Sequence, residues 1–461
     1  MLRTAYSLLL ILIAMLVGGC GQKSAAPPAA ASRPVVAFVR PVSATSVNMP
    51  QLRSSLAASL LSSNRKENAM AGKSLDEEML TDQQIVKKNP SDVSSLNNLA
   101  YIYIRKVRQT VDFRFNTSAE KLLQQALSID PQNYDSWLYL SIVYMARHNF
   151  EQARTTALKA LSINDSGSGA LGILGDACYE LGLYDQAADA YDKMGDLLPG
   201  SPYYARAASY RNITGHPSDA IEIMSEAFEA SDPRDLEDHA WYLLQLGNFS
   251  FDSGKISLAE KYYVQSLQLY PTSYNALAGL AKVRFAQGKT DEAIALYQKA
   301  IAIVPMPDFV AALGDIYFSV GRKVDAEKQY SLVEYIGLIS KINQEIYNRQ
   351  IALFYADHDR KLDEALKLVE NEIQIRKDVY GYDALAWCLY KNGKIQEAVN
   401  AMTKALRLGT RDAKIFFHAG MVYQKSKPVL AQKYLRAALN TNPFFHPIFS
   451  NQAQEALRKL Q

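Results

Sequence analysis

Residues 171–199, LGILGDACYELGLYDQAADAYDKMGDLLP, carry the pattern that decides the fold. Apolar side chains recur three and four residues apart on both sides of a short turn, which is the spacing of two amphipathic helices. Gly175 lies in the first helical segment and Ala187 in the second, so neither adds bulk where the helices would pack. Pro199 has no backbone N–H to donate and ends the unit. The stretch therefore predicts a helix–turn–helix unit whose helices approach each other closely.

The same unit recurs along most of the chain. The alanine of the second helix is found at Ala119, Ala153, Ala187, Ala220, Ala259, Ala293, Ala326, Ala365, Ala398 and Ala431. Successive alanines are 33 or 34 residues apart, except for two steps of 39 residues that follow Ala220 and Ala326. We expect the longer steps to lie in connections near 235–239 and 341–345. A fixed period of this length indicates a repeat architecture.

These columns of residues resemble the tetratricopeptide repeat, whose first helix carries Leu-Gly and Tyr and whose second carries Ala, an aromatic residue and Pro. The resemblance implies an all-α fold, a right-handed superhelical solenoid of about ten helix–turn–helix repeats. Each repeat of such a stack contacts its neighbours, and the first helices line an extended concave groove. Residues 447–460 place apolar side chains on one helical face and polar ones on the other, as a capping helix requires.

The first repeat contains extra residues. The stretch 105–115, RKVRQTVDFRF, is basic and aromatic and lengthens the distance between the two helices of this unit. The following Thr117-Ser118-Ala119-Glu120 matches a capping box, which predicts that a helix begins there. We expect an elongated loop over 105–115, either solvated or in contact with a membrane surface or a partner.

An apolar run, AYSLLLILIAMLV, occupies residues 5–17 behind a short cationic start. Thirteen residues of helix span about 20 Å, whereas the hydrocarbon core of a bilayer is about 30 Å thick. The run is therefore too short for a membrane span and fits the apolar region of a signal peptide.

The residues that end this run are Val17, Gly18, Gly19 and Cys20, and together they resemble the bacterial lipobox. The resemblance implies that Cys20 is lipidated and becomes the first residue of the mature protein. Several acyl chains hold a protein on a membrane far more firmly than one. Gly21 follows the cysteine, and a residue other than Asp at this position implies the outer membrane. The alternative is an ordinary secretory signal with an incidental cysteine.

The chain divides into five segments by composition and pattern. Residues 1–19 are the expected signal peptide, and 20–60 are the lipidated cysteine with an Ala/Pro/Ser-rich tether. Residues 61–91 are expected to form a helical segment or partial repeat, 92–445 the repeat solenoid, and 446–461 the capping helix.

Several classes of function are disfavoured by the sequence. Lys and Arg number 50 against 47 Asp and Glu, so the net charge is +3 and a nucleic-acid partner is not expected. The glycine string at 167–172 follows a helix rather than a strand, so it fits a turn and not a dinucleotide site. The six histidines are scattered without metal-ligand spacing, and we expect no metal, no other cofactor and no catalysis. Cys178 and Cys388, about six repeats apart, are expected to be buried and too distant for a disulfide.

The groove should be lined by the residue that follows the tyrosine column of each first helix. These positions hold Met145, Tyr179, Asn212, Phe251, Phe285, Phe318, Asp357, Tyr390 and Tyr423. The six aromatic residues either form a ladder for an extended apolar or amphipathic ligand, or pack between adjacent repeats. Polar groups that could set the hydrogen-bond register lie nearby, at Asp176, Asn248, Lys282 and Asp315. The candidate partner-binding residues are therefore Tyr179, Phe251, Phe285, Phe318, Tyr390, Tyr423, Asn248 and Lys282.

These features favour a non-enzymatic scaffold in the bacterial envelope. We expect an outer-membrane lipoprotein that faces the periplasm, is anchored through Cys20 and binds envelope proteins or peptides in its groove. The alternative is an accessory lipoprotein of polysaccharide export or secretion, whose aromatic groove contacts a glycan or an outer-membrane barrel. This alternative hypothesis is based only on analogy with helical-repeat lipoproteins of such systems, which share the fold.

Overall fold

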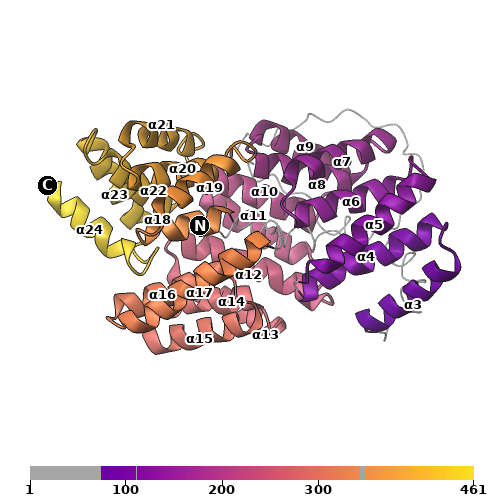
Figure 1. The fold of residues 1–461 in the computed structure, drawn as a ribbon, viewed down its shortest axis with the longest axis horizontal. Helices are drawn as coiled ribbons and strands as arrows, with labels where there is room; N and C mark the ends of the chain where they lie inside the picture. The colour runs from indigo at the N-terminus through magenta and orange to yellow at the C-terminus, as the bar shows by residue number, and fades with distance from the viewer. Residues whose placement is uncertain (1–73, 111, 343–347, 461) are drawn as a thin grey trace.

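The computed structural model describes residues 74–110, 112–342 and 348–460, and every regular element in these ranges is a helix (Figure 1). Ten consecutive helix pairs form the body of the molecule, with α3 (Leu75–Lys88) before them and α24 (Phe449–Lys459) after them. The predicted all-α architecture of repeated helix pairs is confirmed. None of the helices in the described ranges combines the length and the apolar character that a membrane crossing needs.

The first helices of the ten pairs are α4 (Val93–Thr110), α6 (Tyr134–Ala146), α8 (Ser168–Leu181), α10 (Ser201–Ile213), α12 (Leu236–Asp252), α14 (Tyr274–Ala286), α16 (Pro307–Ser319), α18 (Asn348–Asp357), α20 (Val379–Lys391) and α22 (Ala413–Tyr423). The second helices are α5 (Arg114–Ile129), α7 (Phe150–Ile163), α9 (Tyr184–Leu197), α11 (Pro217–Ala230), α13 (Ile256–Leu269), α15 (Thr290–Ile303), α17 (Lys323–Ile342), α19 (Leu362–Glu372), α21 (Ile395–Ala405) and α23 (Pro428–Thr441).

The helices of a pair pack through the small residues that the sequence pattern singles out. All ten second-helix alanines are at most 1% exposed. A Cβ atom added to Gly175 would lie 2.3 Å from the ring of Tyr191, and one added to Gly314 would lie 2.5 Å from Tyr330. Such distances are far inside van der Waals contact, so a side chain at either glycine would push the helices apart. The predicted close approach is confirmed.

The first pair differs from the sequence prediction. Helix α4 continues to Thr110 and α5 begins at Arg114, so the expected long loop over 105–115 and the expected helix start at Thr117 are both wrong. The extra residues lengthen the two helices instead of forming a loop, because extended helices bury more apolar surface and satisfy their own backbone hydrogen bonds.

Two basic residues of this extension, Lys106 and Arg108, are engaged inside the molecule. The Lys106 ammonium pairs with the Asp76 carboxylate of α3 at 2.8 Å, and the Arg108 guanidinium pairs with Glu237 of α12 at 2.8 Å. The side chains of Lys106 and Arg108 are at most 9% exposed. The end of α4 therefore reaches across to α12, and these two cations are not free for a membrane surface.

The two 39-residue steps are absorbed by longer helices. Helix α12 has 17 residues, against 13 in α10 and α14, and it begins at Leu236 inside the stretch expected to be a connection. Helix α17 has 20 residues, against 14 in α15, and ends at Ile342. Residues 343–347 of the second expected connection lie outside the described residues.

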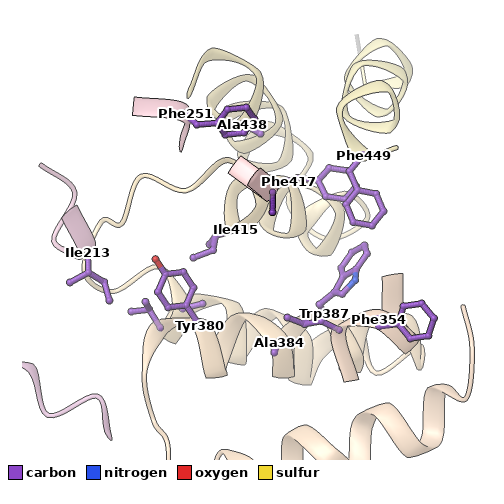
Figure 2. Packing of buried hydrophobic residues seen from close by; sticks show 14 of the residues in the cluster. Ile213, Phe251, Phe354, Tyr380, Ala384, Trp387, Ile415, Phe417, Ala438 and Phe449 are labelled. Atoms are coloured by element: carbon purple, nitrogen blue, oxygen red, sulfur yellow. The ribbon is translucent and has the colours of Figure 1, made fainter. Parts of the chain in front are cut away.

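Distant repeats also touch, along a line that we call the seam. At the seam, the end of α8 meets the segment before α20, the end of α10 meets the segment before α22, and the end of α12 meets the segment after α23. The backbone contacts of the seam are Lys377 N–H to Leu181 O at 3.2 Å, the Thr410 hydroxyl to Ile213 O, and the Asn442 side-chain amide to Phe251 O at 2.7 Å. The superhelix therefore returns onto itself after about six helix pairs, and Figure 2 shows Ile213 and Phe251 beside residues of the C-terminal repeats.

A network of buried ion pairs lies at the seam next to α8, and one of its pairs crosses the seam. Arg376 pairs with Glu180 on the far side, while Arg349 contacts Asp378 at 2.6 Å and Glu372 at 2.9 Å. These five side chains are at most 9% exposed. Removing one member would leave its partner charged and buried, which makes the set strongly interdependent.

Candidate binding cavity

The concave side of the molecule holds a cavity of about 220 Å³. Helices α12, α14, α16 and α18 form most of its wall, as expected for first helices. The start of α22 and the segment 442–447, which we call the C-terminal strap, close the other side. Because Asn442 of the strap is bonded to Phe251 across the seam, the return of the superhelix completes the cavity.

The cavity combines aromatic walls with charged groups. The aromatic lining residues are Phe251, Phe285, Tyr297, Phe309, Phe354, Phe444 and Phe445. The ionisable lining residues are Asp252, Asp308, Asp315, Asp357, Asp412, Lys282, Lys414, His358 and His446. Apolar walls with a few placed polar groups are typical of binding sites.

A repeated hydrogen bond positions the polar groups of the first helices. In three pairs, a second-helix tyrosine that packs on the small residue donates its hydroxyl to the next residue of the first helix. The bonds are Tyr191 to Asp176 at 2.8 Å, Tyr263 to Asn248 at 2.9 Å and Tyr330 to Asp315 at 2.9 Å. Asn248 and Asp315 both line the cavity, so the spacing of the repeat itself holds polar side chains there.

His358 is the first partner of Asp315. Its Nε2 lies 2.7 Å from Asp315 Oδ1, and its Nδ1 lies 2.7 Å from the carbonyl oxygen of Phe354. Both ring nitrogens face acceptors, so both must carry a hydrogen and the ring is an imidazolium. Burial acts to lower the pKa of His358, but the hydrogen bond and the charge of Asp315 outweigh it and the net pKa is raised.

His446 of the strap approaches the same carboxylate in the opposite protonation state. Its Nδ1 accepts the backbone N–H groups of Ile448 at 3.2 Å and Phe449 at 3.3 Å, so this nitrogen carries no hydrogen. Its Nε2 lies 3.3 Å from Asp315 Oδ2 and donates to it. The neutral ring is therefore the form that fits, and burial lowers the pKa of His446 accordingly.

Lys414 is held by a second carboxylate. Its ammonium lies 2.7 Å from Asp357 Oδ2, while the indole N–H of Trp387 donates to Asp357 Oδ1 at 2.8 Å. Burial acts to lower the pKa of Lys414, but the charge of Asp357 outweighs it and the net pKa is raised. The lysine is charged and already paired.

Four of the eight groove residues predicted from the sequence line this cavity: Asn248, Phe251, Lys282 and Phe285. Phe251 is 2% exposed and Asn248 is 8% exposed, so they belong to its floor. Lys282 and Phe285 are half-buried and present more of their surface to a ligand.

The other four predicted residues lie elsewhere. Tyr179 and Tyr423 are each 3% exposed and buried in the core, and Tyr390 stacks on Trp387 with ring centres 5.3 Å apart. Phe318 is 45% exposed and does not line the cavity. The aromatic column therefore does not form one ladder, because packing within the core and against neighbouring helices takes up several of its rings.

Two of the histidines that are scattered along the sequence come together in the structure. His358 and His446 converge on Asp315 although 88 residues separate them in the chain. His358 directly follows Asp357 of the groove column, which is a usable signal, whereas nothing in the repeat pattern marks His446 or Lys414. Within the described ranges, no group of three or more His, Cys, Asp or Glu side chains is arranged to hold a metal ion.

Two further predictions concern cysteines. Cys178 and Cys388 are buried and free. The lipobox residues Val17, Gly18, Gly19 and Cys20 lie outside the described residues.

Family models provide an independent identification of the repeats. Two models described as tetratricopeptide repeat match residues 116–166 with 250–316, and residues 142–202. The chain contains tetratricopeptide repeats. The matched ranges fall in the helix pairs from α5 to α16, where the small-residue packing and the tyrosine hydrogen bonds are found.

The chain is similar to two curated proteins over part of their length. It is 21% identical over 308 residues to the TPR repeat-containing protein MJ1428 of Methanocaldococcus jannaschii, covering 64% of this chain and 53% of that protein. It is 24% identical over 214 residues to the human Protein O-mannosyl-transferase TMTC1, covering 44% of this chain and 23% of that protein. The chain thus spans about half of the first relative and about a quarter of the second.

The chain also superposes on parts of solved structures. Human IFIT1, in a dimer with PPP-AAAA, superposes with a TM-score of 0.48 at 16% identity, covering 73% of this chain and 77% of that chain. PilF of Pseudomonas aeruginosa superposes with a TM-score of 0.37 at 19% identity, covering 45% of this chain and 92% of that chain.

Proposed function

We propose that this tetratricopeptide protein is a non-enzymatic scaffold that binds a segment of a partner protein in the cavity. The observation that carries the proposal is a preformed, aromatic-walled cavity on the concave side, completed by the seam. Its buried carboxylates Asp315 and Asp357 are engaged with cations and hydrogen-bond donors within the chain. This arrangement suits rigid recognition, because a preorganised site loses little conformational entropy on binding.

We further propose that the scaffold is a lipoprotein of the bacterial envelope, anchored at Cys20 in the outer membrane and facing the periplasm. The lipobox-like sequence at 17–20 and the Ala/Pro/Ser-rich stretch that follows it support this part of the proposal. We propose that this stretch is the tether that joins the anchor to the solenoid.

A second candidate function is that of an accessory lipoprotein in polysaccharide export or secretion. The rings of Phe309, Phe444 and Phe285 favour it, because all three line the cavity and retain exposed surface on which an apolar sugar face would pack. Phe444 of the strap is 46% exposed.

The two candidates are separated by photo-crosslinking in cells from a reactive residue placed at Phe285. The same residue at Phe318, which is exposed but outside the cavity, is the control. A discrete protein adduct from position 285, absent from position 318, is the expected result. Adducts to sugar alone would support the second candidate, and no adduct from position 285 would contradict cavity binding of either kind.

A further inference from the structure

We infer that the outer side of α23 is a docking surface for a lipid bilayer that contains anionic headgroups. This surface, which we call the basic face, consists of Lys425, Lys427, Val429, Lys433 and Arg436. The inference goes beyond the proposed function, because it depends neither on what binds in the cavity nor on lipidation of Cys20. It follows from the distribution of charge, the start of α23 and the exposure of one apolar side chain.

Positive charge is concentrated in the last part of the chain. Residues 379–461 hold 12 of the 50 Lys and Arg residues but 4 of the 47 Asp and Glu residues. Their net charge is therefore +8, whereas the preceding residues together carry −5. The sequence between Asp412 and Glu455 contains no acidic residue. A charge asymmetry of this kind within one chain is typical of proteins that bind membranes or nucleic acids.

The residues of the basic face share one side of α23. Val429, Lys433 and Arg436 are spaced four and three residues apart, so they lie in one stripe along the helix. Lys425 and Lys427 belong to the turn that leads into the same helix. All five side chains are exposed. The stripe and the turn therefore form a continuous positive surface.

The capping helix leaves the basic face uncovered. Helix α24 packs beside α23, where the Gln432 side chain donates to the carbonyl oxygen of Leu460. The five residues of the basic face stay exposed in spite of this contact. Both helices lie at one end of the molecule (Figure 1), and no further repeat follows α24 in the described chain.

No carboxylate neutralises the four cations of the basic face. None of them belongs to an ion pair within the described ranges, whereas Lys414 and Lys459 of the same region do. Lys427 and Lys433 each lie over a tyrosine ring, 5.5 and 5.7 Å from its centre. Such a contact leaves the charge of the ammonium group in place. The basic face is therefore a net positive surface.

The start of α23 is electrostatically unfavourable for the folded chain itself. Its N-cap residue is Lys427, whose side chain makes no capping hydrogen bond, and its first turn holds no acidic residue. The amino end of a helix carries a partial positive charge, so an added cation destabilises it. Choices of residue that oppose local folding are expected at functional positions. The positive potential of this turn is better explained by an external anion than by folding.

Val429 favours a bilayer over other anionic partners. Its side chain is 81% exposed, more than any other large apolar side chain in the described ranges, and it lies among the lysines of the stripe. A bilayer interface accepts both kinds of group, because lysines pair with anionic headgroups while an apolar side chain enters the acyl boundary. The phosphate backbone of a nucleic acid would interact with the lysines alone.

The test places a fluorescent reporter in the turn before α23. Ser426, which is exposed there, is changed to cysteine in the full-length chain and labelled with the environment-sensitive dye NBD. Cys20→Ala in the same chain prevents labelling at that position, and Cys178 and Cys388 are buried. The control label is placed at Ser331 of α17, which is also exposed. The apolar run near the amino terminus is common to both proteins, so its own affinity for lipid does not distinguish them.

Each labelled protein is mixed with excess vesicles of phosphatidylcholine, either alone or with about 30% phosphatidylglycerol to make the surface anionic. We expect the probe at position 426 to brighten and shift to the blue with the anionic vesicles only, and the probe at position 331 to respond to neither. Adding about 0.5 M NaCl should abolish the shift, because it shortens the Debye length to about 4 Å.

Two charge-matched variants connect the response to the basic face. One neutralises its three lysines: Lys425→Gln, Lys427→Gln and Lys433→Gln. The control neutralises three exposed lysines of α5, α7 and α9 that belong to no ion pair within the described ranges: Lys121→Gln, Lys159→Gln and Lys193→Gln. Each cation near an anionic surface strengthens binding about fivefold, so losing three from the basic face should weaken docking by at least about tenfold and abolish the shift. The control variant should retain it.

Four results would each overturn the inference. They are a shift that persists in the basic-face variant, an equal shift with neutral vesicles, an equal response of the probe at position 331, and no response to anionic vesicles. The last result would redirect the basic face to an acidic protein or a nucleic acid. A protein adduct from position 285 without any response to lipid would leave the proposed function standing while this inference fails.

Discussion

Because of the seam, the same glycine-to-alanine substitution should destabilise the protein to different extents in turns that occupy equivalent positions of the repeat. Gly182 and Gly321 both end a first helix with positive φ, at +78° and +79°. At either position, placing an alanine in the left-handed conformation costs about 1–2 kcal/mol of stability. A Cβ at Gly321 meets nothing within 4 Å, whereas a Cβ at Gly182 would lie 2.4 Å from the carbonyl oxygen of Lys377. Only Gly182→Ala therefore collides with the returning superhelix.

The extra cost of Gly182→Ala follows from this geometry. The obstructing atoms are backbone, so reaching an ordinary contact of 3.4 Å requires the seam to open by about 1 Å. That movement stretches the Lys377 N–H to Leu181 O hydrogen bond and strains the buried Arg376–Glu180 pair. Overpacking of this kind costs about 1–3 kcal/mol. We expect Gly182→Ala to lower the free energy of unfolding by that much more than Gly321→Ala.

The assay is urea unfolding of both variants followed by circular dichroism, with hydrogen exchange at the Lys377 amide. Gly393→Ala is a second control, because its φ is +76° and its Cβ also meets nothing within 4 Å. The Lys377 amide should exchange faster in Gly182→Ala than in either control. Equal destabilisation of all three variants, with unchanged exchange at Lys377, would show that the turns do not touch in solution.

Three further predictions concern other parts of the molecule. Asp176→Asn should lower the unfolding free energy by about 3 kcal/mol, because it leaves the buried Arg206 side chain, which is 2% exposed, without its carboxylate. The control Asp232→Asn removes a member of an exposed ion pair and should cost less than about 1 kcal/mol. Equal losses of the two variants in urea unfolding would contradict this prediction. Burial lowers the pKa of His446 in the folded protein below its value of about 6.5 in the unfolded chain. The stabilisation that His446 provides is therefore complete above about pH 6.5, and it falls as the pH drops from there towards the pKa of the folded protein. The Tm difference between the wild type and His446→Gln should therefore shrink from pH 7 to pH 5, and a constant difference would refute the assigned protonation. Cys20→Ala should release the protein from membranes, and unchanged membrane fractionation would refute the anchor.

The pairing of helices was predictable because it depends on local spacing. The period of 33 or 34 residues between alanines, together with the glycine twelve residues before Ala187, specifies which faces of two adjacent helices meet. The tyrosine four residues after that alanine then lies over the glycine. Each of these relations is contained within one repeat, so one sequence suffices to infer them.

The seam was not predictable from the same pattern. It results from small rotations between repeats that accumulate over about six helix pairs, and no local pattern records their sum. Gly182 at the seam and Gly321 at an open turn occupy the same column, so they are indistinguishable in sequence. The predicted separation of Cys178 and Cys388 assumes a straight stack, whereas other residues about six repeats apart do touch at the seam.

The candidate site was predictable only where the repeat pattern reaches it. Asn248 and Lys282 directly follow the small residues of α12 and α14, and Phe285 lies one turn after Lys282. These three residues therefore have fixed positions within the repeat and can be identified from it. His446 and Lys414 belong to segments that reach the cavity because the superhelix returns. Their roles depend on contacts with residues far away in the chain, for which the repeat pattern contains no signal.

The central claim, that a partner segment binds in the cavity, is tested most directly by filling the cavity. Ala312 of α16 lines it, and Ala302 of the adjacent α15 is exposed outside it. The affinity of the full-length protein for a partner fragment identified by crosslinking should be measured by fluorescence polarisation in Ala312→Trp and in Ala302→Trp. Binding in the cavity predicts a loss of affinity of at least about tenfold, or about 1.4 kcal/mol, in Ala312→Trp and no change in Ala302→Trp. Wild-type affinity in Ala312→Trp would contradict it.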